Sequence, residues 1–187
     1  MKRYKSKNIW ILIIGILVFL VAYRFDNTIN LFFKNINNEF LDFILGIATN
    51  FGFLVFVALL VPSMIFYKKN KRIVYLLWLS FIISILFAFI AKLIFLRQRP
   101  DEMLVYPFLN IINYSFPSMH STVVFSLLPI LMKHMPKQRY FWLIFTIFVA
   151  FSRVYFGLHF LSDVVFGALV GYLIGNFLLD YEYKVWR

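Results

Sequence analysis

The feature that most constrains this chain is its series of long apolar stretches without a charged side chain. Apolar residues make up 63% of the sequence and charged residues only 14%, whereas soluble domains carry about 25% charged residues. The composition therefore argues against a soluble enzyme and a disordered chain. A hydrocarbon core of about 30 Å is crossed by about 20 helical residues. The stretches predict an all-α, polytopic membrane protein with six transmembrane helices, at residues 8–23, 43–67, 73–91, 118–135, 140–157 and 160–179.

The basic residues orient this six-helix bundle. Thirteen of the 19 Lys and Arg residues flank the helix ends on one side, and the positive-inside rule makes that side cytoplasmic. Both termini then lie in the cytoplasm. The net charge of +11 is mostly a topology signal, so we expect no nucleic-acid partner. These residues are Lys2, Arg3, Lys5, Lys7, Lys68, Lys69, Lys71, Arg72, Lys133, Lys137, Arg139, Lys184 and Arg187.

The sequence contains no internal repeat or linker, so residues 1–187 predict a single membrane-embedded domain. Three of its segments leave alternatives open. The first stretch resembles a signal peptide, but a small residue is missing two positions before Ala22, so we expect an uncleaved anchor. Residues 24–42 fit either an amphipathic helix on the outer surface or a connector with a few buried aromatics. The apolar loop 103–116 could dip into the membrane and guide a lipid tail, or simply cap a site.

The remaining six basic residues fall on the outer side, where no excess of positive charge is expected. Charged side chains within spans are costly and by default mark a polar site. Snorkelling of single side chains to water is the alternative, and it fits Lys92 most easily. It does not explain why His120, His159 and Asp163 fall at similar heights. The six residues are Arg24, Lys34, Lys92, Arg97, Arg99 and Arg153.

Sequence spacing sharpens this picture of an outer polar site. Lys92 and Arg99 are seven residues apart, so they share a face if the helix persists to Pro100. His159 and Asp163 are four residues apart, so Asp163 could accept a hydrogen bond from one ring nitrogen and leave the other free for a substrate. The unpaired backbone N–H groups that precede His120 at the start of its helix favour an anion.

Together these groups describe a phosphate site: three cations, a serine hydroxyl, a helix N-terminus and two histidines. Preorganised positive charge is the expected main contribution to phosphoryl transfer. Only three carboxylates fall near the site, those of Asp101, Glu102 and Asp163, and the chain has no cysteine. We therefore expect neither a metal ion nor another cofactor.

These residues resemble the three signature motifs of the type 2 phosphatidic acid phosphatase superfamily, which also includes vanadium haloperoxidases. The resemblance covers residues 92–163 and places the chain in the membrane lipid-phosphatase branch. One position departs from the pattern, because Met119 occurs where the family usually has glycine. The motifs read Lys92-(six residues)-Arg99-Pro100, Pro117-Ser118-Met119-His120 and Ser152-Arg153-(five residues)-His159-(three residues)-Asp163.

The resemblance implies a role for each matching residue. His159 attacks phosphorus and forms a phosphohistidine, Asp163 fixes the tautomer of His159, and His120 protonates the leaving group. The phosphoryl oxygens are bound by four further residues. The side chain of Met119 must point away from the anion, and its presence puts the acceptor and substrate preference in doubt. The four oxygen-binding residues are Lys92, Arg99, Ser118 and Arg153.

Other conspicuous residues have simpler interpretations. His134 is interpreted as a solvated loop histidine on the cytoplasmic side, and Arg24 and Arg97 as anchors at the membrane interface. Aromatic runs are interpreted as lipid-facing surface. A stripe of small residues on the last helix predicts packing against a neighbouring helix, with a dimer interface as the alternative. The stripe consists of Gly167, Gly171 and Gly175.

The function predicted is a metal-independent membrane phosphatase with its active site facing the outer side of the cell membrane. Its substrate would be a lipid phosphate or diphosphate: polyprenyl diphosphate (such as undecaprenyl diphosphate), phosphatidylglycerophosphate or phosphatidic acid. A lipid phosphotransferase that passes the phosphoryl group to an alcohol is the alternative. A non-enzymatic anion-binding transporter is the third hypothesis, but binding alone would not need an acid and a nucleophile.

Overall fold

The structure is a computed structural model that describes residues 2–36, 38–100 and 113–185. Within these ranges the secondary structure is helical and contains no β-strand. Each of the six predicted segments is largely helical, and the second is interrupted. The elements are α1 (Lys2–Lys34), α2 (Glu39–Thr49), α3 (Phe51–Val55), the π-helical turn η1 (Phe56–Leu60), α4 (Val61–Tyr67), α5 (Lys71–Phe95), α6 (Met119–His134), the 3-10 turn η3 (Pro136–Gln138), α7 (Arg139–Tyr155) and α8 (Leu161–Val185).

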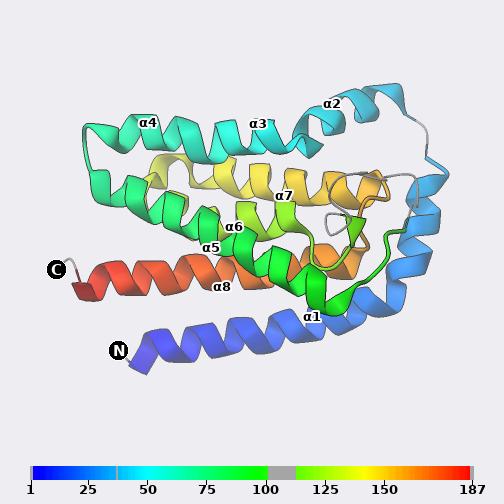
Figure 1. The fold of residues 1–187 in the computed structure, drawn as a ribbon, viewed down its shortest axis with the longest axis horizontal. Helices are drawn as coiled ribbons and strands as arrows, with labels where there is room; N and C mark the ends of the chain where they lie inside the picture. Colours follow the sequence, from blue (N-terminus) through cyan, green and yellow to red (C-terminus); the bar gives the residue numbers. More distant parts are fainter. Residues whose placement is uncertain (1, 37, 101–112, 186–187) are drawn as a thin grey trace.

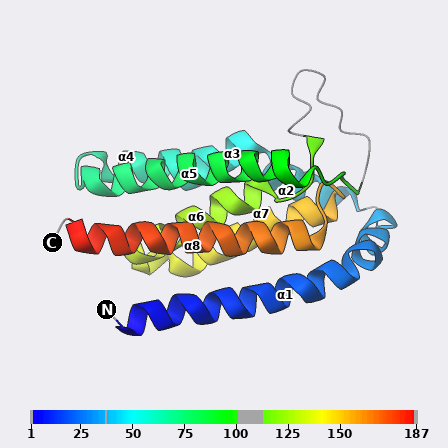
Figure 2. The ribbon, with the colours of Figure 1, turned by 60° about the horizontal axis from the view of Figure 1, so that its bottom comes forward.

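Helix α1 runs along the side of the bundle next to α8 and then turns across its end (Figures 1 and 2). The segment after Arg24 continues this helix as far as Lys34. Ile29 and Phe33 pack there against a small core cluster of α7 and α8 side chains. The helical part of the prediction for residues 24–42 is therefore confirmed up to Lys34, while its place at the membrane surface stays a prediction.

The second apolar stretch is broken at Asn50, where the backbone is extended (φ −72°, ψ 119°). The Asn50 side chain accepts a hydrogen bond from Phe53 N at 3.1 Å and thereby caps α3. The helices on the two sides of Asn50 are bent by 58°. Further along, the π-helical turn comes directly before the start of α4, where Pro62 has no N–H for the helical ladder.

Helix α5 begins after Asn70, whose side chain accepts from Arg72 N at 3.1 Å, and it ends at Phe95. Leu96 then adopts a left-handed conformation with φ 47°. The helix therefore does not persist to Pro100. The condition under which Lys92 and Arg99 would share a helical face is thus not met, because Arg99 lies in the irregular segment beyond the helix.

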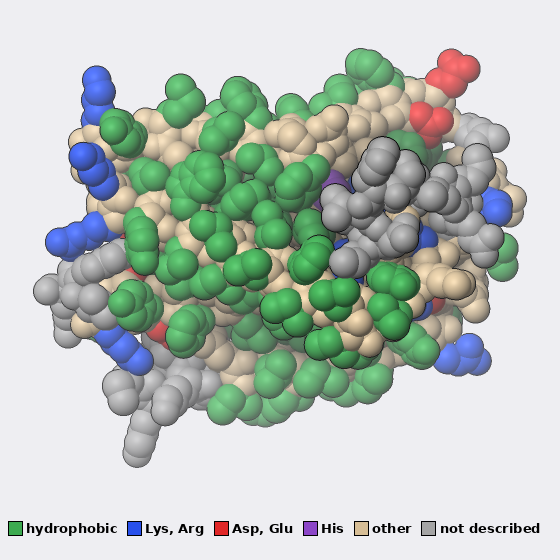
Figure 3. All heavy atoms as spheres, in the orientation of Figure 1, with side chains coloured by type: hydrophobic (Ala, Val, Ile, Leu, Met, Phe, Trp, Pro, Cys, Tyr) green, Lys and Arg blue, Asp and Glu red, His purple; other side chains and the backbone are tan. Residues whose placement is uncertain are grey.

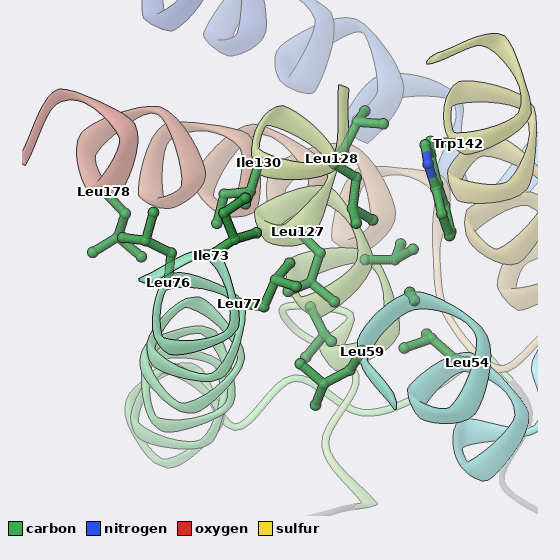
Figure 4. Packing of buried hydrophobic residues seen from close by; sticks show 14 of the residues in the cluster. Leu54, Leu59, Ile73, Leu76, Leu77, Leu127, Leu128, Ile130, Trp142 and Leu178 are labelled. Carbon is green, nitrogen blue, oxygen red and sulfur yellow. The ribbon is translucent and has the colours of Figure 1, made fainter. Parts of the chain in front are cut away.

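Helix α6 lies at the centre of the bundle, in contact with α5, α7 and α8. The main hydrophobic core packs around it, with Leu127 and Ile130 on the side of Leu76 and Leu77 of α5 and Leu128 on the side of Trp142 of α7 (Figure 4). Membrane helices approach one another closely where their contact faces carry small residues, and α8 provides such a face.

The glycine stripe of α8 packs directly on the backbone of α6. A Cβ added at Gly167, Gly171 or Gly175 would meet the carbonyl oxygens of Ser118, Thr122 and Ser126, respectively, closer than real Cβ atoms approach. The prediction that this stripe packs against a neighbouring helix is thus confirmed, and the neighbour is α6.

Within the described residues, three helices are long and apolar enough to cross a membrane, or four if the pair bent at Asn50 counts as one span. On the face seen in Figure 3, hydrophobic side chains cover the length of the bundle, and Lys and Arg side chains gather at its two ends. Helices α6 and α7 have 16 and 17 residues. Six spans therefore stay a prediction, although the described residues form a helical bundle typical of membrane proteins.

The first and last described residues lie at the same end of the bundle, together with the turn between α4 and α5 (Figure 1). At this end Lys133 pairs with Glu182 at 2.6 Å. His134 is the last residue of α6, and its half-buried ring lies 3.4 Å from the Glu182 carboxylate. The interpretation of His134 as a solvated loop residue is therefore wrong, although it does lie at the end that carries the termini.

Candidate active site

The seven predicted site residues lie at the opposite end of the bundle, on α5 to α8 and the segments between them. Lys92 is almost completely buried, with 1% of its surface exposed. Its Nζ donates to the carbonyl oxygen of Tyr114 and lies 3.5 Å from that of Ser115. The snorkelling interpretation of Lys92 is wrong, because the ammonium group points to buried backbone carbonyls rather than to water.

Arg99 connects two segments that are distant in the sequence. Its Nε donates to Asn113 O at 2.9 Å, and a terminal nitrogen donates to Leu158 O at 2.8 Å. The second contact places the guanidinium group next to the turn that carries His159. Arg99 thus reaches the site from an irregular segment and not from a helical face.

The turn that carries His159 is held by the end of α7. The backbone N–H groups of Leu158 and His159 both donate to Arg153 O at 3.1 Å. Gly157 has a φ of 61°, a left-handed conformation that favours glycine. The local sequence therefore fixes Arg153 and His159 relative to each other.

His159 is 3% exposed and lies in the positive field of this end of the bundle. Burial, followed by the nearby charges of Arg153, Arg99 and Lys92, holds the pKa of its imidazole well below the usual value. A ring of lowered pKa is neutral at pH 7 and keeps a lone pair for nucleophilic attack.

The four-residue spacing predicted a direct hydrogen bond between Asp163 and His159, but the structure does not contain it. Asp163 Oδ2 lies 3.8 Å from His159 Nδ1, which is too long for a hydrogen bond. Instead, the Ser115 hydroxyl donates to Asp163 Oδ2 and lies 3.4 Å from His159 Nδ1. Phe160 N also donates to Oδ2 at 2.8 Å. The aspartate therefore reaches the histidine through a serine.

His120 and Arg153 meet at the end of α2. His120 Nε2 lies 3.0 Å from Thr49 O, and Arg153 donates to the same oxygen at 3.2 Å. Arg153 also donates to the Thr49 hydroxyl at 2.5 Å. The break at Asn50 leaves this carbonyl without its helical partner, because Phe53 N donates to the Asn50 side chain instead.

Ser118 caps α6, its side chain accepting a hydrogen bond from Ser121 N at 3.5 Å. Ser118 is fully buried, and its own N–H donates to Asp163 O at 3.1 Å. Met119 packs against the main hydrophobic core, as its predicted orientation away from an anion requires. The start of α6 and the start of α8 are thereby joined through their backbones.

The interpretation of Arg97 as an interface anchor is wrong. Its guanidinium group donates to Asp163 Oδ1 at 2.7 Å and to Asp26 Oδ2 at 2.8 Å. The rings of Phe160 and Tyr23 lie 4.1 and 5.4 Å from its central carbon. Arg24, by contrast, is exposed at this end of the bundle, which agrees with the anchor interpretation.

Four contact residues were missed or misjudged at the level of sequence: Asp26, Thr49, Arg97 and Ser115. Asp26 carried a signal, since an acidic residue beside an apolar span is costly and suggests a polar partner. Ser115 and Thr49 carry none, because single hydroxyl residues are common in loops and at helix ends. Residues 101–112 lie outside the described residues, so Asp101, Glu102 and most of the loop 103–116 stay without a structural account.

A pocket of about 250 Å³ is lined by residues of α1, α2, the end of α7 and the segments that follow α5 and α7, and none of the seven site residues lines it. Pro100 and Gly157, which border it, are neighbours in sequence of Arg99 and Leu158. Its polar side chains come from Asn30, Lys34 and Asp42, and Asp42 accepts a hydrogen bond from the Tyr155 hydroxyl at 2.7 Å. The pocket is therefore linked to the cationic cluster only through the chain segments that carry Arg99 and Leu158.

Residues 73–187 match the model of the PAP2 superfamily, and the chain belongs to this superfamily of type 2 phosphatidic acid phosphatases. The matching region contains the whole cluster from Lys92 to Asp163. The family resemblance inferred from the three motifs is thereby confirmed.

Among curated proteins, the chain is 30% identical over 114 residues to an undecaprenyl-diphosphatase of Sulfolobus acidocaldarius, which covers 58% of this chain and 54% of the relative. It is 34% identical over 76 residues to a lipid A 4'-phosphatase of Porphyromonas gingivalis, covering 40% and 30%. It is 31% identical over 102 residues to phosphatidylglycerophosphatase B of Bacillus subtilis, covering 49% of each chain. The matches thus span about half the length of these relatives or less.

Two solved structures share the fold. The crystal structure of a transmembrane PAP2-type phosphatidylglycerolphosphate phosphatase from Bacillus subtilis superposes with a TM-score of 0.73 at 22% identity, covering 99% of this chain and 98% of that one. The crystal structure of Aquifex aeolicus LpxE gives a TM-score of 0.66 at 22% identity, covering 83% and 95%. At this level of identity the similarity concerns the fold.

Proposed function

We propose that the protein is a metal-independent membrane phosphatase that hydrolyses a lipid phosphate or diphosphate through a phosphohistidine intermediate. The observation that carries the proposal is the gathering of buried Lys92, buried Arg153 and half-buried Arg99 at the end of the bundle that holds buried His159, where the charges of all three act on its ring. A buried concentration of positive charge is costly unless an anion is bound there. The names of the curated relatives add lipid phosphates and diphosphates as the substrate class.

In the first chemical step, His159 Nε2 attacks phosphorus and the bond from phosphorus to the leaving oxygen breaks. The Ser115 hydroxyl donates to Asp163, so its oxygen can accept a hydrogen bond from His159 Nδ1. This arrangement keeps the proton on Nδ1 and the lone pair on Nε2. His120 supplies a proton to the leaving oxygen, a contribution of typically about 10²–10⁴-fold.

In the second step, water attacks the phosphohistidine. His120, which has lost its proton, accepts one from the water, the phosphorus–nitrogen bond breaks, and the lone pair returns to Nε2. Lys92, Arg99 and Arg153 neutralise the phosphoryl oxygens in both steps. The charge stabilisation thus comes from the side chains of the chain itself, with no step assigned to a metal ion.

Phosphate release from defined lipids tests the proposal. The detergent-purified protein should release phosphate from lipid monophosphates or diphosphates in the presence of a chelator, and His159→Ala should lose at least about 10³-fold of this activity. His134→Ala is a matched control, because this histidine lies at the other end of the bundle. Full activity of His159→Ala would exclude the mechanism.

The orientation with six spans, cytoplasmic termini and an outward-facing site belongs to the same proposal. It is supported by the basic turns that lie at the end with the termini. The chain has no cysteine, so single cysteines can be introduced at exposed Asn35 and Lys69, which lie at opposite ends. A membrane-impermeant thiol reagent should label position 35 in intact cells and position 69 only after permeabilisation. The reverse pattern would invert the orientation.

A phosphotransferase is the second candidate, because the pocket bordered by Pro100 and Gly157 offers space for an alcohol. Its polar lining by Asn30, Lys34 and Asp42 suits hydroxyl groups. Transfer and hydrolysis share the phosphohistidine and differ in the second step. Product analysis with glycerol or sugar alcohols would separate them, since a transferase forms a new phosphate ester while a hydrolase releases free phosphate. The transporter hypothesis predicts a different result. The wild type and His120→Ala would both bind the anion, and neither would form a phosphate ester or release free phosphate.

A further inference from the structure

Arg97 lies between two buried carboxylates that come from different helices. One terminal nitrogen contacts Asp163 Oδ1 at 2.7 Å and the other contacts Asp26 Oδ2 at 2.8 Å. The side chains of Asp26 and Asp163 are 5% and 0% exposed, whereas that of Arg97 is 23% exposed. Arg97 therefore pairs its single positive charge with both acids, and its orientation depends on both.

Asp26 also holds the start of α8. Its Oδ1 accepts from Ser162 N at 2.9 Å, and its Oδ2 accepts from the Ser162 hydroxyl at 2.5 Å. A carboxylate is favoured at a helix N-terminus, where backbone N–H groups lack partners. Ser162 directly precedes Asp163, so α1 is tied to the backbone on which Asp163 lies.

Removing one of the two acids would change the arginine as well. Without Asp26, one terminal nitrogen of the Arg97 guanidinium group loses its buried acceptor. The group can then rotate, or donate to both carboxylate oxygens of Asp163. Either movement changes the position of the carboxylate. Ser115, which connects Asp163 to His159, would move with it.

We infer that Asp26 is a positioning residue of the active site: it holds Arg97 in the orientation in which Arg97 fixes Asp163, and thereby the His159 ring. This inference rests on the proposed function, in which His159 is the nucleophile. Asp26 lies on α1, outside the region that matches the family model. The first helix thus contributes to the chemistry as well as to the membrane anchor.

Steady-state kinetics of four variants test the inference. Asp26→Asn should lower kcat about 10-fold to 100-fold, the loss expected from a small misplacement of the nucleophile, with KM changed less than about threefold because the phosphate-binding cations stay in place. Asp26→Glu keeps the charge and should retain more activity than Asp26→Asn. Glu182→Gln breaks an ion pair between α6 and α8 at the far end and should leave kcat unchanged.

The fourth variant, Asp26→Arg combined with Arg97→Asp, separates positioning from mere attachment of α1. The exchange keeps opposite charges at positions 26 and 97 but places a carboxylate against Asp163. We expect its melting temperature in detergent to exceed that of Asp26→Arg alone, while kcat stays low. Recovery of kcat in the exchanged pair would show that the contact only attaches α1 and would overturn the inference.

His159→Ala distinguishes the two levels of the argument. If His159→Ala is inactive and Asp26→Asn keeps wild-type kcat, the positioning role fails and the proposed function stands. If His159→Ala is fully active, the proposed function fails first. If Asp26→Asn does not yield folded protein, the exchanged pair decides, because recovery of kcat in Asp26→Arg combined with Arg97→Asp still overturns the inference.

Discussion

Asp163 reaches His159 through a hydroxyl group: the carboxylate oxygen lies 3.8 Å from Nδ1, and Ser115 Oγ, which donates to that carboxylate, lies 3.4 Å from the same nitrogen. The four-residue spacing on its own suggested a direct hydrogen bond. The inserted serine means that the orientation of the histidine depends on a segment that precedes α6 and not on α8 alone.

Ser115→Ala should lower kcat about 10-fold while KM stays near the wild-type value, because the variant leaves His159 without its connection to Asp163 but leaves the cations intact. The matched control is Ser84→Ala, since among the described residues the buried Ser84 hydroxyl donates within α5, to Phe81 O at 2.9 Å. Equal kcat for the two variants would argue against a relay through Ser115.

Thr49→Val should raise KM about 10-fold, because Arg153 loses a charge-assisted hydrogen bond that fixes it for binding of the phosphoryl oxygens. Thr146→Val is the matched control, because it is the same substitution at a threonine whose hydroxyl donates to Leu143 O in its own helix. Phosphate release at varied lipid concentration measures both. An unchanged KM for Thr49→Val would show that the Thr49 hydroxyl is dispensable for Arg153.

Gly171→Ala should lower the free energy of unfolding by about 1–3 kcal/mol, because the added methyl group forces α8 away from the α6 backbone. Gly46→Ala is the opposite case, since a Cβ at Gly46 meets no atom within 4 Å; in helix α2 it should be neutral or stabilising by up to about 1 kcal/mol. Unfolding in mixed detergent, followed by circular dichroism, measures both. Equal stability of the two variants would contradict the packing described.

His159 should stay neutral when the pH is lowered through 6.5, the value at which an unperturbed imidazole is half protonated. Its pKa is lowered in the folded protein, so protonation favours the unfolded state, and stability should fall only as the pH drops below about 6.5. Nitrogen chemical shifts of labelled histidine, assigned with the His159→Gln protein, report the charge. Half-protonation at or above pH 6.5 would contradict this environment.

The positions of the helices could be predicted from the sequence because an uncharged apolar stretch in a membrane protein has one stable conformation. The grouping of basic and histidine residues at one end followed from the same helices. The end of α5 could not be predicted. Leu96 follows it in a left-handed conformation, and the segment Leu96-Arg97-Gln98 contains no glycine or asparagine that would indicate this.

The side-chain partners at the site were harder to predict than its members. Arg97 was interpreted as an anchor because nothing near it in the sequence offers a carboxylate, whereas its two acids come from α1 and α8. The Thr49 carbonyl is available only because the helix breaks at Asn50. Such contacts depend on tertiary packing between distant segments, which spacing along one helix does not contain.

Helix α1 is sparsely covered by the rest of the protein, since only 6% of its most apolar stretch is buried. Bilayer thickness therefore becomes a variable that affects the chemistry. A helix surrounded mostly by lipid adjusts its tilt to the thickness of the hydrocarbon layer. The same helix carries Asp26, whose contacts reach Asp163. We therefore expect turnover to vary with the acyl-chain length of the surrounding lipids, even when the substrate itself is unchanged.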